Sequence, residues 1–420
     1  MNTKKGLIFL QIIGLAGLIM LLNADEINDA VRAGDLAKVQ LLIEKNPGLV
    51  NAKNTAGQTA LFDAVMSRRL EIAEYLISKG ADVNARNNFH MSPLHIACNR
   101  NASLEIVRLL VEKGADLNAE AKYLGKPLDL ATENAEPPLV QYLSSKGAQC
   151  TPLDFQVVPL SEKLRRIAFP WGMRNNLVVS SGPDGVLIVD TGFSKRAIET
   201  IKKTIGRFAN GDIKYIINTH ADWDHVAGNG LASSIENVIG FQKLNGGEFP
   251  KIISKTDKPL QGRQGQTLPA PYSLPFNGEE IKIIPYPGLH SEADVLVYFT
   301  ISGVVCMGDL LLSQNFPAVR DAKGYRDFLN DVIDVFPDGT LFVSGHGREL
   351  PLEELKKYRN MLNTTFGIMK MNVEAGKSAE EIIRADVLSA YRTDYSFLDW
   401  LGPDMWILQI TKNLKLGIQK

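Results

Sequence analysis

Apolar residues recur with helical spacing in the first third of the chain. The stretches LEIAEYLISKG from Leu70 and LEIVRLLVEKG from Leu104 place them at positions i, i+3, i+4 and i+7. The segments QTALFDAV (58–65), MSPLHIAC (91–98) and GKPLDLAT (125–132) repeat with a period of 33–34 residues. Such self-similarity predicts stacked helix pairs, each burying its apolar face only against its neighbours. We expect about four such units in residues 25–150, the first of them divergent.

Short apolar runs rich in β-branched residues replace this pattern after Thr151. NNLVVSS and GVLIVDTG flank SGPDG, which predicts a β-hairpin, and SKRAIETIKKTIGRF is typical of a helix. Further strands are predicted at IKYIINT, EEIKIIPYP, VLVYFTI, GVVCMGDL and TLFVSGHG. This alternation predicts a layered domain over 151–350 with sites at strand ends. Residues 351–420 have helical spacing and form a predicted helical extension of that domain, with Ser378 and Glu381 placed as a capping box.

The N-terminal segment has the pattern of a targeting sequence. Lys4 and Lys5 precede the uncharged apolar stretch Gly6–Leu22, and a small residue, Ala24, follows. We therefore expect residues 1–24 to be a signal peptide and the protein to be periplasmic or secreted. The alternative is an uncleaved anchor, because the apolar run is close to the minimum spanning length. A membrane is an expected partner only in that case.

Composition excludes several classes of protein. The 420 residues have a formal net charge of −1 and a pI near 6.6. Without a basic run, electrostatic capture of nucleic acid is not expected. The three cysteines, Cys98, Cys150 and Cys306, have no CxxC spacing. The chain is therefore neither a disulfide scaffold nor a cysteine-based zinc module.

Histidines and aspartates gather where predicted strands end. Four of the six histidines follow apolar strands: His220 and His225 in THADWDH, His290 in PGLHSEAD, and His346 in SGHG. Asp222 and Asp224 lie in the first of these motifs, and Asp309 ends another strand. A single histidine is more often a packed core residue than a ligand. Four at strand ends, with three aspartates alongside, indicate metal binding.

The two halves resemble two known families. MSPLHIA nearly reproduces the T-P-L-H-x-A signature of the ankyrin repeat. HADWDH, with the later His290, Asp309 and His346, resembles the H-x-H-x-D-H motif and distant ligands of metallo-β-lactamase-fold hydrolases. DTG (190–192) resembles the structural aspartate turn that precedes the metal loop. The implied architecture is an all-α ankyrin array followed by an αββα sandwich with its metal site along one edge of the sheets.

This resemblance also implies a ligand set. The first metal would be held by His220, Asp222 and His290, and the second by Asp224, His225 and His346, with Asp309 bridging. Two divalent ions, expected to be zinc, would share a hydroxide that acts as the nucleophile, and they would stabilise the developing oxyanion. Asp224 would also orient the water and protonate the leaving group.

Asp222 departs from the family pattern, which has histidine at that position. Three interpretations follow: Asp222 binds the first metal directly, binds it through water, or leaves that position weak. Direct ligation is the one we favour. A hard oxygen ligand also makes iron or manganese possible in place of zinc. Asp309 resembles the bridging aspartate of glyoxalase II-like hydrolases, whereas classical β-lactamases tend to have cysteine or serine there. Cys306 is three residues early and is expected inside the strand.

Three functions are consistent with these features. The first is a metal-dependent hydrolase that cleaves an ester, thioester, lactone or amide in a small-molecule substrate. The second is an iron-dependent redox enzyme of the same fold, which only Asp222 favours. The third is a non-catalytic ankyrin interaction protein with a degenerate site. In each case the repeats are expected either to bind a protein partner or to pack against the second domain.

Overall fold

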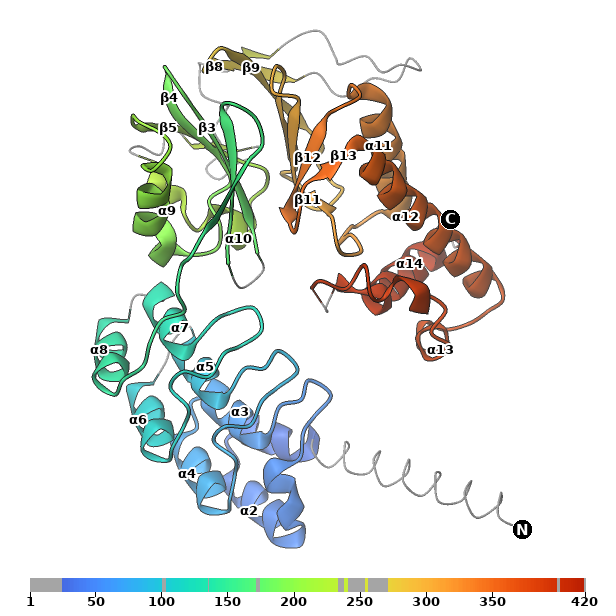
Figure 1. Cartoon of the computed structure of the whole chain (residues 1–420). Coiled ribbons are helices and arrows are strands. Elements are labelled where there is room, and N and C mark those ends of the chain that lie inside the picture. The colour runs from blue at the N-terminus through green and yellow to red at the C-terminus, as the bar shows by residue number, and fades with distance from the viewer. Residues whose placement is uncertain are drawn as a thin grey trace. The chain divides into compact units, whose positions relative to one another are not determined.

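The computed structural model divides the chain into two compact units, Met1–Pro152 and Leu153–Lys420 (Figure 1). It describes residues 25–99, 103–134, 136–170, 174–232, 238–240, 254–255, 271–398 and 401–418. The predicted signal peptide or anchor in residues 1–24 lies outside the described residues. Within the described part of the chain, no helix is both long and apolar enough to cross a membrane.

The first unit is a stack of short helix pairs, as the repeats predict. After a helical segment over 25–33, its helices are α2 (Leu36–Lys45), η1 (Pro47–Asn51), α3 (Ala60–Met66), α4 (Leu70–Ser78), α5 (Pro93–Cys98), α6 (Leu104–Glu112), α7 (Pro127–Glu133) and α8 (Pro137–Ser145). One continuous apolar cluster runs through all the helix pairs. Each pair therefore completes the core of its neighbour.

A ladder of asparagines links successive repeats. The side-chain amides of Asn51, Asn84 and Asn118 donate to the carbonyl oxygens of Gly80, Gly114 and Gly147 over 2.9, 3.0 and 3.5 Å. Their amide oxygens accept backbone N–H groups of the next repeat, over 2.8, 2.7 and 2.8 Å. The same bond thus recurs at the sequence period, and the predicted ankyrin architecture is confirmed.

Two sheets face each other in the second unit. The first has the order β1-β2-β3-β4-β5-β6 and the second β13-β12-β11-β10-β9-β8-β7. The strands of the first sheet are β1 (Gln156–Pro159), β2 (Leu164–Ala168), β3 (Asn176–Gly182), β4 (Gly185–Val189), β5 (Ile213–Asn218) and β6 (Val238–Gly240). Those of the second are β7 (Ser254–Lys255), β8 (Tyr272–Phe276), β9 (Glu279–Pro285), β10 (Val295–Phe299), β11 (Val304–Leu312), β12 (Leu341–His346) and β13 (Leu350–Pro351).

Helices cover the outer face of each sheet, so the expected αββα order is confirmed. Figure 1 shows α9 (Ile198–Ile205), preceded by η2 (Lys195–Ala197), on the first sheet, and α11 (Ala322–Val335) and α12 (Leu352–Glu374) on the second. Strand alternation divides the apolar residues between the layers. Val178 and Leu187 pack between the sheets, whereas the next residues, Val179 and Ile188, pack against α9.

The crossover helices place the ends of key strands at one edge. The strand pairs β4–β5 and β11–β12 are parallel, and α9 and α11 make these two connections. The short helices α10 (Trp223–Val226) and η3 (Asn229–Leu231) follow β5. The pairing of β11 with β12 shifts register between Cys306 and Gly308 and again before Leu312. These register shifts lie on both sides of Asp309, and such an irregularity changes the direction in which a side chain points.

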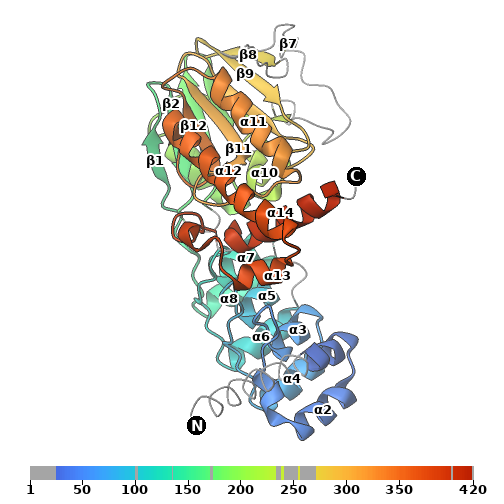
Figure 2. The ribbon, with the colours of Figure 1, turned by 90° about the vertical axis from the view of Figure 1, so that its right-hand side faces the viewer.

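The predicted C-terminal extension is helical and packs on the second sheet. Beyond α12 it contains α13 (Ala379–Arg384), η5 (Ser389–Tyr391) and α14 (Pro403–Ile418), which Figure 2 shows at the far end of α12. The capping box is confirmed, because Ser378 and Glu381 exchange hydrogen bonds of 2.8 and 3.2 Å. Trp406 is fully buried and donates to Thr365 over 3.1 Å. This part of the tail therefore belongs to the core.

Candidate metal centre

The structure brings all seven predicted ligand residues together. They come from the loop after β5 and the helix α10, from the turn after β9, from within β11, and from the end of β12. Their donor atoms form three overlapping groups within 4.8 Å: His220–Asp222–His290, His220–His225–Asp309 and Asp224–His225–His346. The first and third groups correspond to the two ligand triads expected from the sequence.

The first triad lies on the open side of the centre. Oδ2 of Asp222 is 3.3 Å from Nε2 of His290 and 3.7 Å from Nε2 of His220. The side chain of Asp222 is 52% exposed, whereas those of His220 and His290 are buried or nearly so. A substrate would therefore approach the centre from the side of Asp222.

The second triad is buried. Oδ2 of Asp224 lies 3.3 Å from Nε2 of His346 and 3.7 Å from Nε2 of His225. All three residues have less than a tenth of their surface exposed. Solvent therefore reaches this half of the centre less readily than the half that contains Asp222.

Asp309 lies between the two triads and faces both. Its Oδ1 is 3.2 Å from Nε2 of His225 and 3.2 Å from Nε2 of His346. Its Oδ2 is 3.9 Å from Nε2 of His220 and 3.8 Å from Nε2 of His290. Each carboxylate oxygen is thus directed to a different triad, as a bridging ligand requires.

In two histidines of the centre, a hydrogen bond from Nδ1 fixes which ring nitrogen carries the proton. Nδ1 of His290 lies 2.8 Å from the carbonyl of Ala318, which can only accept, so Nδ1 carries the proton. Nδ1 of His225 likewise donates to Oδ2 of Asp190 over 2.9 Å. The Nε2 atoms of both rings therefore face the centre as lone pairs when the rings are neutral.

His220 is oriented through a relay. The hydroxyl of Thr219 donates to Oδ2 of Asp190 over 2.8 Å, so its oxygen accepts from Nδ1 of His220 at 3.0 Å. Nε2 of His220 is buried, and within the described residues it has no hydrogen-bond partner. A buried polar atom without a partner is costly, and coordination of a cation would satisfy it. The arrangement fits a metal.

The electrostatics also favour a cation. Burial alone would raise the pKa of the Asp309 carboxyl, but His346 and His225 hold that pKa well below its usual range. Burial likewise opposes ionisation of Asp224, yet His346 and His225 bring its pKa to about 2. Burial lowers the pKa of His220 to about 4, with His225 adding to the effect. Against the effect of burial, neighbouring carboxylates raise the pKa of His290 and that of His346 to about 9, so a metal that binds here must displace protons from these two rings.

Two glycines give Asp309 its place. A Cβ atom on Gly345 would lie 2.2 Å from Oδ1 of Asp309. Gly308 has a φ of +51°, and a Cβ atom there would lie 2.3 Å from Oγ1 of Thr219. Side chains at either position would displace the carboxylate or the residue that orients His220.

One supporting residue, Asp294, was missed in the sequence. It is buried, and its Oδ2 accepts the backbone N–H groups of His290 and Ser291 over 2.9 and 2.8 Å. These bonds fix the turn that presents His290. The sequence did contain a signal for this role, because an aspartate four residues after a ligand can accept backbone N–H groups of the turn that carries the ligand.

Three further residues near the ligands in the sequence have structural roles. Cys306 lies inside β11 and is buried in the core between the sheets, as expected. Arg348, which follows the last ligand, forms a surface ion pair with Glu354. Trp223 is half exposed and packs edge-on against Phe193 at 6.0 Å. The variable loops over 169–176 and 261–273, from which the sequence predicts pocket walls, are described only in part, because residues 171–173 and 261–270 lie outside the described residues.

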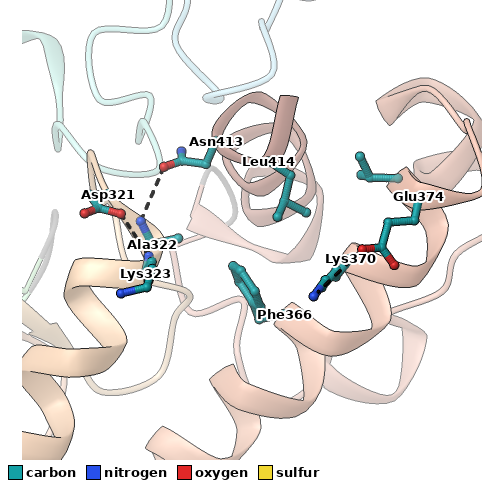
Figure 3. A pocket seen from close by; sticks show the side chains of 9 residues that line it. Asp321, Ala322, Lys323, Phe366, Lys370, Glu374, Asn413 and Leu414 are labelled. Carbon is teal, nitrogen blue, oxygen red and sulfur yellow. Dashed lines mark hydrogen bonds and ion pairs between the residues drawn. The ribbon is translucent and has the colours of Figure 1, made fainter. Parts of the chain in front are cut away.

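A cavity of about 330 Å³ lies in the helical extension, apart from the seven ligand residues (Figure 3). Phe366, Val373 and Leu414 supply apolar walls, and Lys370 and Glu374 lie at its margin. Asn413 accepts the backbone N–H of Ala322 at 3.4 Å, which connects α14 to the start of α11. None of the side chains that line this cavity is a predicted metal ligand.

Comparisons with known proteins agree with both halves of the architecture. The profile of the Metallo-beta-lactamase superfamily matches residues 169–361, and that of Ankyrin repeats (many copies) matches 61–111. The chain therefore carries a metallo-β-lactamase superfamily domain preceded by ankyrin repeats. Membership of this superfamily suggests hydrolase activity on a small molecule, and ankyrin repeats suggest protein interaction. The fold also implies binding of a divalent metal.

Individual relatives match one half each. The chain is 23% identical to a Beta-lactamase-like protein 2 homolog of Caenorhabditis elegans over 248 residues, 59% of this chain and 77% of the relative. It is 37% identical to Protein phosphatase 1 regulatory subunit 27 of Mus musculus over 70 residues, 17% of this chain and 46% of that protein. It is 36% identical to the Notch-regulated ankyrin repeat-containing protein of Xenopus tropicalis over 72 residues, 16% of this chain and 63% of the relative.

These relatives correct one expectation. The prediction of a periplasmic or secreted protein is wrong, because the relatives that the chain matches are eukaryotic ankyrin-repeat and β-lactamase-like proteins. The prediction came from a short apolar run after two lysines. Such a run reports hydrophobicity and does not by itself identify a compartment.

Proposed function

We propose that the protein is a metal-dependent hydrolase that holds two divalent ions and cleaves an ester, thioester, lactone or amide bond. The observation that carries the proposal is the position of Asp309, with one oxygen directed to each histidine pair. A side chain that only neutralised one neighbouring imidazole would not need this geometry. Two cations sharing one carboxylate account for it.

The seven side chains divide into two ligand sets. His220, Asp222 and His290 would hold the first ion, and Asp224, His225 and His346 the second, with Asp309 shared. Bound divalent ions lower the pKa of water and polarise the bond under attack. Zinc suits the histidine-rich second set. Asp222 adds a hard oxygen to the first set, so iron or manganese is the alternative there.

Asp224 is the proposed proton carrier. Its Oδ2 faces His346, so Oδ1 is the atom left to accept a proton from the attacking water. With a pKa of about 2, the carboxyl is ionised at neutral pH and is a weak base, so it would hold that proton only in passing. The same oxygen would then return the proton to the leaving atom, which lets an alkoxide, thiolate or amine depart as a neutral species.

The open side of the centre is proposed as the place where substrate binds. Asp222 is the exposed member of the ligand set, and Trp223 presents a half-exposed indole next to it in the chain. Substrate would enter there, next to the residues that would hold the first ion.

The ankyrin unit is proposed to bind a protein partner. Phe89 is exposed, and its ring contacts that of Tyr123 edge-on at 6.5 Å on a neighbouring loop. Exposed aromatic side chains held in this way are typical of protein interfaces. The phosphatase regulatory subunit among the relatives is, by its name, itself an interacting protein.

A substrate panel with a matched variant tests the hydrolase proposal. Full-length protein reconstituted with Zn²⁺ would be assayed on p-nitrophenyl esters, an acyl thioester, a homoserine lactone and a β-lactam. Asp309→Ala should lower kcat/KM by at least about 100-fold on any substrate that turns over. Met371→Ala, at an exposed position on α12, should not change it. Turnover that survives Asp309→Ala would contradict the proposal. Iron content with oxygen consumption and no hydrolysis would favour the redox alternative.

A further inference from the structure

Two adjacent asparagines join the two sheets beside the buried triad. Asn175 immediately precedes β3, and Asn176 is its first residue. Both are buried, and consecutive residues of an extended chain direct their side chains to opposite sides. One side chain therefore reaches the loop that carries Asp224, and the other reaches the end of β12 that carries His346.

Asn175 holds Asp224 through both hydrogens of its amide. Its Nδ2 donates to the carbonyl oxygen of Asp224 over 2.9 Å and to Oδ2 of the same residue over 3.1 Å. Because both acceptors belong to Asp224, the NH₂ end of the amide must face it. The backbone of Asn175 also forms a β-bridge with His346. Nδ2 of Asn175 also lies 3.5 Å from Nε2 of His225, so this one residue contacts all three members of the second triad.

Asn176 holds the strand end on either side of His346. Its Nδ2 donates to the carbonyl oxygens of Ser344 and Gly347, both over 2.8 Å. Its Oδ1 accepts from Nη1 of Arg166 over 2.8 Å. Arg166 in turn pairs with Glu349 at 2.9 Å. The residues flanking His346 are therefore attached to β2 and β3 of the opposite sheet.

We propose that Asn175 and Asn176 are positioning residues that form a clamp across the sheets and preset the second metal position. Asp224 and His225 come from the first sheet, whereas His346 comes from the second. The spacing between these ligands depends on how the sheets meet at this edge. The asparagine clamp fixes that spacing before the ion binds. The inference rests on the proposed dinuclear function.

The clamp acts on one metal position and not on the other. His220 and His290 are oriented by Thr219 and Ala318, and none of their hydrogen bonds involves the two asparagines. Loss of the Asn175 amide would leave the buried Asp224 carboxylate without its neutral donor. Removing such a supporting hydrogen bond typically weakens metal binding about 10–100-fold. The loss should fall on the second ion alone.

A third asparagine provides a matched control. Asn277, between β8 and β9, is buried and donates to Oγ of Ser180 over 3.1 Å and to the carbonyl of Gly185 over 3.2 Å. It too joins the second sheet to the first, but at the opposite end of β3. Asn277→Ala therefore removes an equivalent cross-sheet amide away from the centre.

Stepwise metal titration of the full-length chain tests the clamp. Wild type, Asn175→Ala, Asn175→Leu and Asn277→Ala would be stripped with a chelator and titrated with Zn²⁺ and with Co²⁺. Metal per chain and the Co²⁺ absorption spectrum would be recorded, together with the melting temperature. Leucine has the same branched skeleton as asparagine, leaves no cavity and lacks the donor, so comparison with alanine separates the lost hydrogen bond from a cavity.

The clamp predicts that in both Asn175 variants one of the two equivalents binds about 10–100-fold more weakly and the other is unchanged. Asn277→Ala should lower the melting temperature and still take up two equivalents as wild type does. Two equivalents bound with wild-type affinity by the Asn175 variants would overturn the clamp alone. An equal loss in Asn277→Ala would also overturn it, by assigning the effect to general stability. A wild-type chain that binds no ion would overturn both the clamp and the proposed function.

Discussion

Oδ2 of Asp222 lies 3.3 Å from Nε2 of His290, on the exposed side of the ligand cluster. A histidine is the usual residue at this point of the family motif, and a carboxylate has a shorter reach. Here the loop after β5 brings the carboxylate close enough to share a cation with His290 and His220. We therefore propose direct ligation, which this short distance favours over the two interpretations in which Asp222 does not bind the metal itself.

Asp190→Asn should weaken metal binding while leaving the fold intact. Asp190 accepts from Nδ1 of His225, and from the backbone N–H and the hydroxyl of Thr219, each over 2.8–2.9 Å. An amide has only one oxygen to offer these three donors, so the rings of His225 and His220 lose their orientation. We expect Zn²⁺ affinity to fall about 10–100-fold, measured by competition with a chelating dye.

Asp184→Asn is the control for that substitution. Asp184 accepts the backbone N–H of Asn277 over 2.6 Å, in the hairpin turn at the other end of β3 and β4. Its loss should cost some stability and no metal affinity. Unchanged Zn²⁺ affinity in Asp190→Asn would show that the orientation of these rings does not depend on Asp190.

Gly345→Ala should displace Asp309 and release metal. The added methyl group would lie 2.2 Å from Oδ1 of Asp309, a distance that no relaxed structure tolerates. We expect Zn²⁺ affinity to fall by at least about 10-fold, with both ions affected because Asp309 faces both triads. Isothermal titration of the stripped protein would measure this.

Gly367→Ala, in the middle of α12, is the control for Gly345→Ala. Nothing lies within 4 Å of a Cβ atom at that position. Alanine in a helix interior is more favourable than glycine by about 0.5–1 kcal/mol, so the free energy of unfolding should rise slightly. If Gly345→Ala also bound two ions with wild-type affinity, the proposed bridging position of Asp309 would be in error.

Acid should destabilise the ankyrin unit through His95. Nδ1 of this buried ring accepts the backbone N–H of Ser92 over 3.0 Å, and Nε2 donates to the carbonyl of Gly125 over 3.1 Å. Protonation of Nδ1 would replace its acceptor with a second donor, and burial lowers the pKa to about 4. Between about pH 6.5 and pH 4 the unfolded state binds the proton and the native state does not. As the pH is lowered through that window, the free energy of unfolding therefore decreases by about 3 kcal/mol in total.

Circular dichroism and tryptophan fluorescence separate this effect from the second unit. All four tryptophans lie beyond residue 152, so fluorescence does not report on the repeats. The unfolding transition of the repeats, seen by circular dichroism without a change in fluorescence, should move to lower temperature in acid. His95→Gln should lose most of that pH dependence. An identical pH dependence in this variant would assign the effect to other groups.

Spacing predicted the ligand cluster because strand ends in a layered fold converge on one edge. His220, His290 and His346 each follow an apolar run, so their meeting could be expected without coordinates. The supporting residues could not be found in this way. Asn175 contacts a residue 49 positions away in the chain and has no local signature for that contact, whereas Asp190, 35 positions from His225, was indicated only by the DTG motif of the family.

The strands at the margins were missed for a similar reason. β2 has the sequence LRRIA, in which two arginines do not suggest a strand of a sandwich. Arg166 is buried there because Glu349, far along the chain, lies 2.9 Å from it. A charge that is buried by a distant partner looks like an exposed charge in the sequence.

The central claim is that the centre holds two divalent ions and that Asp222 binds one of them. Metal content per chain, measured by inductively coupled plasma mass spectrometry on full-length protein purified without chelator, tests it most directly. The comparison includes Asp222→Ala and Asp222→His. The account predicts two ions in the wild type, partial loss of one in Asp222→Ala, and its retention in Asp222→His. One ion unaffected by either substitution, or no metal at all, would contradict it.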